Sequence, residues 1–266
     1  MAAAKPHLFF IAKSLWPAMV FCMSEQTHPV SSDPVVKVRD IRKDFGYLRA
    51  VEGISFDLNK GEFLTIFGPN GAGKTTLIKI LSGLTRPTSG SATVAGFDVL
   101  GGSVRLRKEI GVISHATCLY PDLTALENLL FYGKLYGLND LEDKANKAIN
   151  EVGLQLRRHD RVRTFSRGMQ QRLTIARATL HDPSVLFFDE PFTGLDLQAT
   201  NVLKDHLHEL HTGKRTLIMT THDMSCGLEM CDRVAIQNKG RFAMLESIDR
   251  IDRENFEKLY TETLEL

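Results

Sequence analysis

Residues 68–75 read Gly68-Pro69-Asn70-Gly71-Ala72-Gly73-Lys74-Thr75, which fits the spacing G-x-x-x-x-G-K-[ST] without a gap. The apolar run 63–67 precedes this stretch and the run 76–81 follows it, as in a strand that enters a glycine-rich turn and leaves it as a helix. The backbone N–H groups of such a turn and the N-terminus of the helix point at phosphates. The stretch predicts a nucleotide-binding loop; the alternative is a glycine-rich turn that matches by chance.

Two side chains of this loop carry the expected chemistry. Lys74 would reach the β- and γ-phosphates of the nucleotide, and the hydroxyl of Thr75 would ligate Mg²⁺. The predicted nucleotide contacts are the residues of the loop and the residue that follows it: Gly68, Pro69, Asn70, Gly71, Ala72, Gly73, Lys74, Thr75 and Thr76.

Composition is that of an ordinary globular protein. The chain has 266 residues, of which 43% are hydrophobic and 24% charged, enough to bury a full core. Its 33 Lys and Arg residues balance 32 Asp and Glu residues, so no overall field favours nucleic acid as a partner. The cysteines show neither metal-ligand nor disulfide-framework spacing, which favours packed free thiols and a reducing compartment; they are Cys22, Cys118, Cys226 and Cys231.

The N-terminal region 1–34 is expected to be a leader that is disordered or not translated. Its apolar run 8–23 superficially resembles a signal peptide, but Lys13 and Pro17 interrupt it and no small-residue cleavage site is clear. At about 16 residues the run is also short for a membrane-spanning helix. Met23, which opens a polar stretch, is the expected true start.

From residue 35 onward, strand patterns alternate with helix patterns. Residues 35–39 and 54–58 alternate between apolar and polar, as half-buried strands do. Residues 185–188 form a continuous apolar run, which is typical of a parallel strand buried on both faces. The pattern predicts an α/β fold, namely a P-loop NTPase (RecA-like) core with an antiparallel β subdomain.

A helical subdomain is predicted as an insertion at about 117–183. No convincing strand lies in this interval, and Thr124 with Glu127 forms a capping box at the start of one of its helices. The nucleotide-binding domain is expected to span 35–246, followed by a helical tail at 247–266.

An acidic pair follows the apolar run 185–188. Asp189 ends the strand at the position from which P-loop enzymes hold Mg²⁺. Glu190 would project beyond the γ-phosphate, where a carboxylate can polarise water, so we assign it as the general base. A solvated strand end is the alternative for such a pair taken by itself.

A second anion-binding helix start is predicted at Ser166-Arg167-Gly168. Ser166 would cap the helix and Gly168 would allow close backbone approach at its first turn. One chain does not need two phosphate cradles on separate lobes for one nucleotide. A head-to-tail homodimer does, because the second cradle of each chain would cover the nucleotide held by its partner. A capped helix alone also explains the motif.

Taken in order, these motifs resemble those of the ATP-binding cassette (ABC) proteins, over residues 35–244. The family's signature, usually Leu-Ser-Gly-Gly-Gln, reads here Phe165-Ser166-Arg167-Gly168-Met169. The resemblance implies an ATPase that uses ATP and Mg²⁺, with Gly194-Leu195-Asp196 as the D-loop and His222 as the switch histidine beside the γ-phosphate. It also implies that Phe45 stacks on adenine, with Tyr47 as the fallback and a core aromatic as the alternative.

The chain departs from the family pattern at two positions. His115 stands where the family carries a glutamine that helps coordinate Mg²⁺, and imidazole cannot copy the paired donor and acceptor of an amide. Arg167 replaces the first glycine of the signature, and its side chain could point toward the phosphates or into solvent.

A narrower resemblance concerns one branch of the family. The stretches 113–115, 119–129, 165–172 and 191–196 are similar to the ATP-binding subunit of the haem exporter in bacterial c-type cytochrome maturation. Cassettes of drug, sodium or polysaccharide exporters share much of this pattern. The resemblance implies a peripheral subunit at the cytoplasmic face of the inner membrane, which docks on separately encoded transmembrane permease subunits.

Two other classes of function are weighed against a transporter subunit. A soluble cassette that acts as a clamp or regulator commonly carries two cassettes in one chain, whereas this chain has one. A small-molecule kinase or GTPase would leave His222 and the motif around Ser166 unexplained, and no guanine-reading motif is evident.

Overall fold

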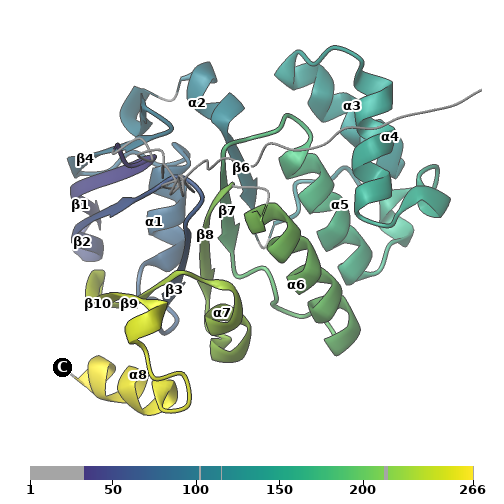
Figure 1. Ribbon diagram of the computed structural model, residues 1–266. Coiled ribbons are helices and arrows are strands. Elements are labelled where there is room, and N and C mark those ends of the chain that lie inside the picture. Colours follow the sequence, from purple (N-terminus) through teal and green to yellow (C-terminus); the bar gives the residue numbers. More distant parts are fainter. Residues whose placement is uncertain (1–32, 102, 115, 213–214, 266) are drawn as a thin grey trace, which may run out of the picture. The chain divides into compact units, whose positions relative to one another are not determined.

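The computed structural model describes residues 33–101, 103–114, 116–212 and 215–265 (Figure 1). Its strands are β1 (Val36–Phe45), β2 (Leu48–Leu58), β3 (Phe63–Phe67), β4 (Ser89–Val94), β5 (Phe97–Asp98), β6 (Ile110–Ile113), β7 (Val185–Asp189), β8 (Thr216–Thr221), β9 (Arg233–Asn238) and β10 (Arg241–Ser247). Its α-helices are α1 (Lys74–Leu81), α2 (Val104–Glu109), α3 (Ala125–Tyr136), α4 (Leu141–Glu151), α5 (Arg167–Thr179), α6 (Leu197–Thr212), α7 (Met224–Met230) and α8 (Phe256–Glu265).

The central sheet has six strands in the order β10-β9-β3-β8-β7-β6. Neighbours from β9 to β6 pair in parallel, and β10 pairs antiparallel with β9. Every residue of β3, β7 and β8 is buried, which explains why their sequences are mostly apolar and do not alternate with polar residues. Alternate residues enter two different cores, as Phe63 and Leu64 of β3 do.

A second, four-stranded sheet has the order β2-β1-β4-β5 and is antiparallel throughout. Helix α1 contacts β2 and β4 of this sheet and β7 of the central sheet, so it lies between the two sheets (Figure 1). Leu77 and Ile80 of α1 are fully buried in the core that the two sheets share. This contact holds the second sheet beside the start of α1.

Helices α3, α4 and α5 pack against one another on the other side of the central sheet (Figure 1). The capping box predicted at Thr124 and Glu127 is present at the start of α3. Their buried residues, among them Leu129, Ile149 and Leu173, join the core on that face of the sheet. The predicted α/β fold with a P-loop NTPase core is therefore confirmed.

The structure adds elements that the patterns did not reveal. Strand β6 has only four residues and α2 only six, too short for a periodicity to be recognised. The leader at 1–32 and His115 lie outside the described residues. None of the helices in the described parts of the chain is both long and apolar enough to cross a bilayer.

Candidate functional site

The carboxyl ends of three neighbouring parallel strands form the floor of the candidate site. Phe67 at the end of β3 pairs with Thr221 of β8, and Asp189 at the end of β7 pairs with Thr220 of β8. Open α/β sheets bind ligands outside the carboxyl ends of their strands. The register thus brings the glycine-rich loop, the acidic pair and His222 to one edge of the sheet, although they are far apart in sequence.

Gly73 is held in a conformation that only glycine adopts without strain. Its φ is +98°, and a Cβ atom there would lie 1.9 Å from the carbonyl oxygen of Ala50. Gly73 is the N-cap of α1, so the N-terminus of this eight-residue helix opens directly into the loop. The arrangement has the geometry that the sequence predicts for an anion cradle.

The ammonium group of Lys74 is folded back over the loop. Its Nζ donates to the carbonyl oxygens of Gly68 and Pro69, at 2.7 and 3.2 Å, and lies 3.4 Å from Oε1 of Glu190. Lys74 is only 6% exposed, so these contacts stabilise a buried charge that would otherwise be costly. An entering phosphate would replace Glu190 as the counter-ion of Lys74.

The oxygen atoms that would hold Mg²⁺ lie together. The hydroxyls of Thr75 and Thr220 both donate to Oδ1 of Asp189, at 2.9 and 2.7 Å. Mg²⁺ prefers such hard oxygen donors and usually takes one or two protein ligands in addition to phosphate oxygens and water. This donor set fits the ion. Thr220 was not among the predicted site residues, although it stands two positions before His222 in the sequence.

Glu190 has a left-handed backbone conformation, with a φ of +52°. This conformation is uncommon for a residue with a side chain. The Glu190 N–H donates to the backbone oxygen of Thr220 at 3.0 Å and thereby anchors the turn after β7. Oε2 of Glu190 lies 2.7 Å from Nδ1 of His222, whose side chain is 62% exposed. The carboxylate therefore stands between a lysine and a histidine at the rim of the loop.

A pocket opens over the glycine-rich loop. It is lined by residues 69–76, by Glu190 and by three residues of the second sheet, namely Phe45, Leu48 and Ala50. Phe45 is 53% exposed and is held by Lys43, whose Nζ lies 4.9 Å from the ring centroid. Tyr47 is fully exposed and is not among the described residues that line the pocket. The geometry therefore favours Phe45 as the partner of a base.

Ser166 and Gly168 lie apart from this pocket. Ser166 accepts a hydrogen bond from the N–H of Met169 at 3.3 Å and so caps α5, as predicted. A Cβ on Gly168 would lie 2.9 Å from the Cβ of Ala199, so Gly168 also allows α5 to approach α6 closely. Neither residue is among those described as lining the pocket over the loop. Within one chain, Ser166 and Gly168 therefore do not share the pocket over the glycine-rich loop.

Arg167 lies against the chain that follows Glu190. A Cβ on Gly194 would be 2.8 Å from the Cζ of Arg167, so the guanidinium rests on the loop after β7. Arg167 and Glu190 line a cleft together with Ser114 and Thr117. His115, which lies between these last two residues in sequence, is outside the described part of the chain.

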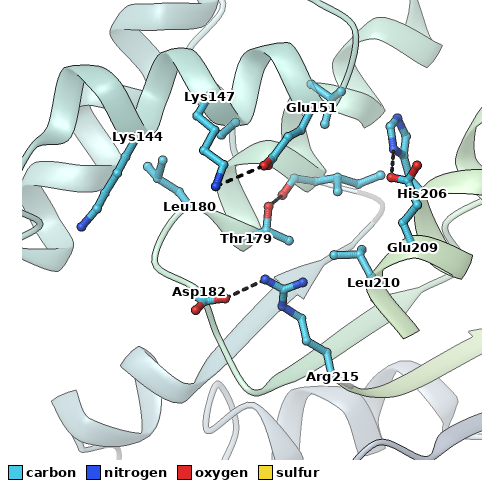
Figure 2. Close-up of a pocket in the computed structure, with 13 residues that line it drawn as sticks. Lys144, Lys147, Glu151, Thr179, Leu180, Asp182, His206, Glu209, Leu210 and Arg215 are labelled. Carbon is cyan, nitrogen blue, oxygen red and sulfur yellow. Dashed lines mark hydrogen bonds and ion pairs between the residues drawn. The ribbon is translucent and has the colours of Figure 1, made fainter. Parts of the chain in front are cut away.

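Another pocket, between α4, α5 and α6, shares no residue with the pocket over the loop. Figure 2 shows that several of its charged side chains pair with one another, while Lys144 points away from these pairs. The pairs are Lys147 with Glu151 at 3.8 Å, Arg215 with Asp182 at 2.6 Å and His206 with Glu209 at 3.6 Å. Because these charges are compensated within the chain, we assign no ligand to this pocket.

Known proteins match most of the chain. The family described as ABC transporter matches residues 51–193. The linearmycin resistance ATP-binding protein LnrL of Bacillus subtilis (strain 168) is 40% identical over 77% of this chain and 67% of its own. The ABC transporter ATP-binding protein NatA of the same organism is 37% identical over 77% of this chain and 86% of its own.

Two further comparisons extend these matches. The Nod factor export ATP-binding protein I of Ralstonia nicotianae is 36% identical over 80% of this chain and 67% of its own. Among solved structures, an ATP-binding subunit of an ABC transporter superposes with a TM-score of 0.77 at 29% identity and covers 86% of this chain and 99% of its own.

Proposed function

The chain belongs to the ATP-binding subunits of ABC transporters, and from this premise we propose that two copies of it energise export through separately encoded permease subunits. The ATPase activity follows from the family. The proposed location is the cytoplasmic face of the inner membrane, where the chain would be bound peripherally through its permease. The permease partner, the homodimer and the direction of transport belong to the proposal.

ATP binding begins with an exchange of partners at Lys74. The triphosphate enters the cradle at the start of α1, and Lys74 leaves Oε1 of Glu190 for the β- and γ-phosphates. Adenine stacks on the exposed ring of Phe45, which gives affinity with little selectivity between bases. Thr75 and Asp189 would hold Mg²⁺, which neutralises phosphate charge when it is bound.

Hydrolysis uses the pair formed by Glu190 and His222. Once Lys74 has turned to the phosphates, Glu190 is the carboxylate that can accept a proton from water. The water oxygen bonds to the γ-phosphorus as the bond to the β-phosphate oxygen breaks, which yields ADP and phosphate. Nδ1 of His222 lies 2.7 Å from Oε2 of Glu190, so this exposed histidine can orient the carboxylate toward the attacking water.

The proposed dimer rests on the finding that the start of α5 and the pocket over the loop are separate within one chain. Ser166 caps α5 and Gly168 lies in its first turn, where the two residues would form a second phosphate cradle. Neither residue lines the pocket over the glycine-rich loop of its own chain. In the proposed head-to-tail dimer they cover the γ-phosphate bound by the partner chain. The dimer would close on ATP and reopen after hydrolysis. These changes would move the helical subdomain, proposed at about 117–183, relative to the permease.

The cargo is proposed from the relatives. Two relatives, 40% and 36% identical, are named for linearmycin resistance and Nod factor export, which supports outward transport of a small molecule. Haem export for c-type cytochrome biogenesis is the narrower candidate and rests on the resemblance at 113–115, 119–129, 165–172 and 191–196. Export of drugs, sodium or polysaccharide is the alternative, and a soluble clamp is less favoured.

The decisive experiment is to purify the tagged full chain from its own cells in detergent and to identify what comes with it. We expect a multi-span permease in roughly equimolar amount, and ATPase activity that the exported molecule stimulates when the complex is reconstituted. Stimulation by haem and not by hydrophobic drugs would select the haem exporter. Recovery with ribosomes or DNA, and without any membrane protein, would overturn the transporter proposal.

A further inference from the structure

Gln237 is a buried polar residue at the end of β9 that the chemistry described above does not use. It is 0% exposed. Within the described part of the chain, neither its side-chain nitrogen nor its side-chain oxygen has a hydrogen-bond partner. Buried amides are almost always paired, because removing them from water without a partner is unfavourable. An orphaned amide in the middle of a core therefore needs a physical reason.

The surroundings of Gln237 connect it to the phosphate-binding loop. A Cβ on Gly68 would lie 2.2 Å from the backbone oxygen of Gln237, so the first glycine of the loop sits directly on β9. A Cβ on Gly73 would lie 2.9 Å from Nε2 of Gln237 and 1.9 Å from the carbonyl oxygen of Ala50. The unpaired amide nitrogen of Gln237 and the carbonyl oxygen of Ala50 therefore both lie close to the same side of Gly73.

This point is also where the second sheet meets the loop. Ala50 belongs to β2 and lines the pocket together with Phe45. The turn after β9 connects the loop to β2 through Gly240. The N–H of Gly240 donates to the Ala72 oxygen at 3.0 Å, and its carbonyl oxygen accepts from the Glu52 N–H at 2.7 Å. A movement of Gly73 would therefore change its spacing from both Gln237 and Ala50.

We propose that Gln237 is a positioning residue for nucleotide binding, whose amide becomes paired with the Ala50 carbonyl when the loop closes around phosphate. The proposal rests on the assignment of residues 68–75 as the nucleotide site. Seating a phosphate turns the loop N–H groups toward the anion and moves Gly73, which lets the amide and the carbonyl approach each other. The hydrogen bond then forms only in the bound state, so it favours binding. It also draws the strand next to Phe45 toward the loop.

Gln237→Met tests this inference, because methionine fills a similar volume without polar atoms. Calorimetric titration with MgADP is expected to give a Kd about 3- to 10-fold weaker than that of the wild type, the effect of one net hydrogen bond. The melting temperature without nucleotide should not fall, since the orphaned amide is gone. At saturating MgATP, kcat should change less than 2-fold, while KM rises with Kd. Gln237→Leu is a second variant with the same expectation.

Thr65→Val is the matched control. Thr65 is also 0% exposed and lies on β3, but its hydroxyl donates to the Gly227 oxygen at 3.2 Å. This variant should lower the melting temperature and leave the Kd for MgADP unchanged. An unchanged Kd for MgADP in Gln237→Met would overturn the inference; this result is expected if a buried water pairs with the amide in both the free and the bound state. Equal losses of affinity in Gln237→Met and Thr65→Val would also overturn it. Failure of the wild type to bind MgADP would instead overturn the nucleotide site itself.

Discussion

Nδ1 of His222 lies 2.7 Å from Oε2 of Glu190, while Nζ of Lys74 lies 3.4 Å from Oε1 of the same carboxylate. The two oxygens of Glu190 thus have different partners. Lys74 is buried and belongs to the loop, whereas His222 is exposed and directly follows β8. When a triphosphate recruits Lys74, His222 is the residue left to orient the carboxylate.

His222→Ala is expected to reduce the ATPase rate by about 100-fold or more, because Glu190 loses the group that orients it and general-base catalysis is worth about 10² to 10⁴. Binding of MgADP should be nearly unchanged, since the histidine does not line the pocket over the loop. Steady-state rates at saturating MgATP check this. His206→Ala is the control, because His206 pairs with Glu209 in the other pocket; equal activity of the two variants would refute the assignment.

Asp189→Asn is expected to weaken the response to Mg²⁺ more than the affinity for nucleotide. The substitution keeps the size of the side chain but removes the charge next to the hydroxyls of Thr75 and Thr220. The Mg²⁺ concentration that gives half-maximal ATPase activity should rise at least about 10-fold, since a direct or water-mediated carboxylate contact to the ion is weakened. An unchanged Mg²⁺ titration curve would show that Asp189 does not serve the metal.

His181 makes stability depend on pH. Burial lowers the pKa of His181 below its ordinary value of 6.5, and this effect outweighs the hydrogen bond to the Ile110 oxygen, which raises it. The imidazole also stacks on Tyr136 with ring centroids 3.9 Å apart. Between about pH 6.5 and the lower folded-state pKa, the unfolded chain binds more protons at this group. Its contribution to stability is therefore present above about pH 6.5 and is lost as the pH falls.

His181→Phe should accordingly flatten the pH dependence. Phenylalanine keeps a ring for Tyr136 but does not titrate. At about pH 7.5 the variant should be less stable by about 1 kcal/mol, through loss of the hydrogen bond, and the difference from the wild type should shrink on acidification to about pH 5.5. Denaturant unfolding at both pH values measures this. A difference that widens at low pH would contradict the stated direction of the shift.

Much of the architecture was predictable because it is encoded locally. The spacing of residues 68–75, the apolar run before Asp189 and the caps at Thr124 and Ser166 each need only a few neighbouring residues to be recognised. The P-loop core predicted from them is confirmed. The domain limits and the chemical roles of the site residues remain predictions.

The features that escaped prediction depend on contacts between distant segments. Thr220 reaches Asp189 only because β7 and β8 pair in a particular register. Gln237 meets Gly73 and Ala50 only because β9 pairs with β3 and the second sheet closes over the loop. In the sequence, Gln237 looks like an ordinary polar residue before a turn. A single sequence does not show in which register two strands pair or where two backbone segments approach each other closely.

The most direct measurement concerns the composite site. Glu190→Gln should bind MgATP without hydrolysing it, so the two chains should remain closed around two nucleotides. In gel filtration with light scattering, this variant is expected to run as a monomer of 29.8 kDa without nucleotide and at about twice that mass with MgATP. The double variant Glu190→Gln with Ser166→Glu carries a negative charge at the start of α5, which would repel the γ-phosphate bound by the partner chain. It should therefore remain monomeric with MgATP. A wild-type ATPase rate per chain that is independent of protein concentration, together with a monomeric Glu190→Gln variant in MgATP, would contradict the proposal.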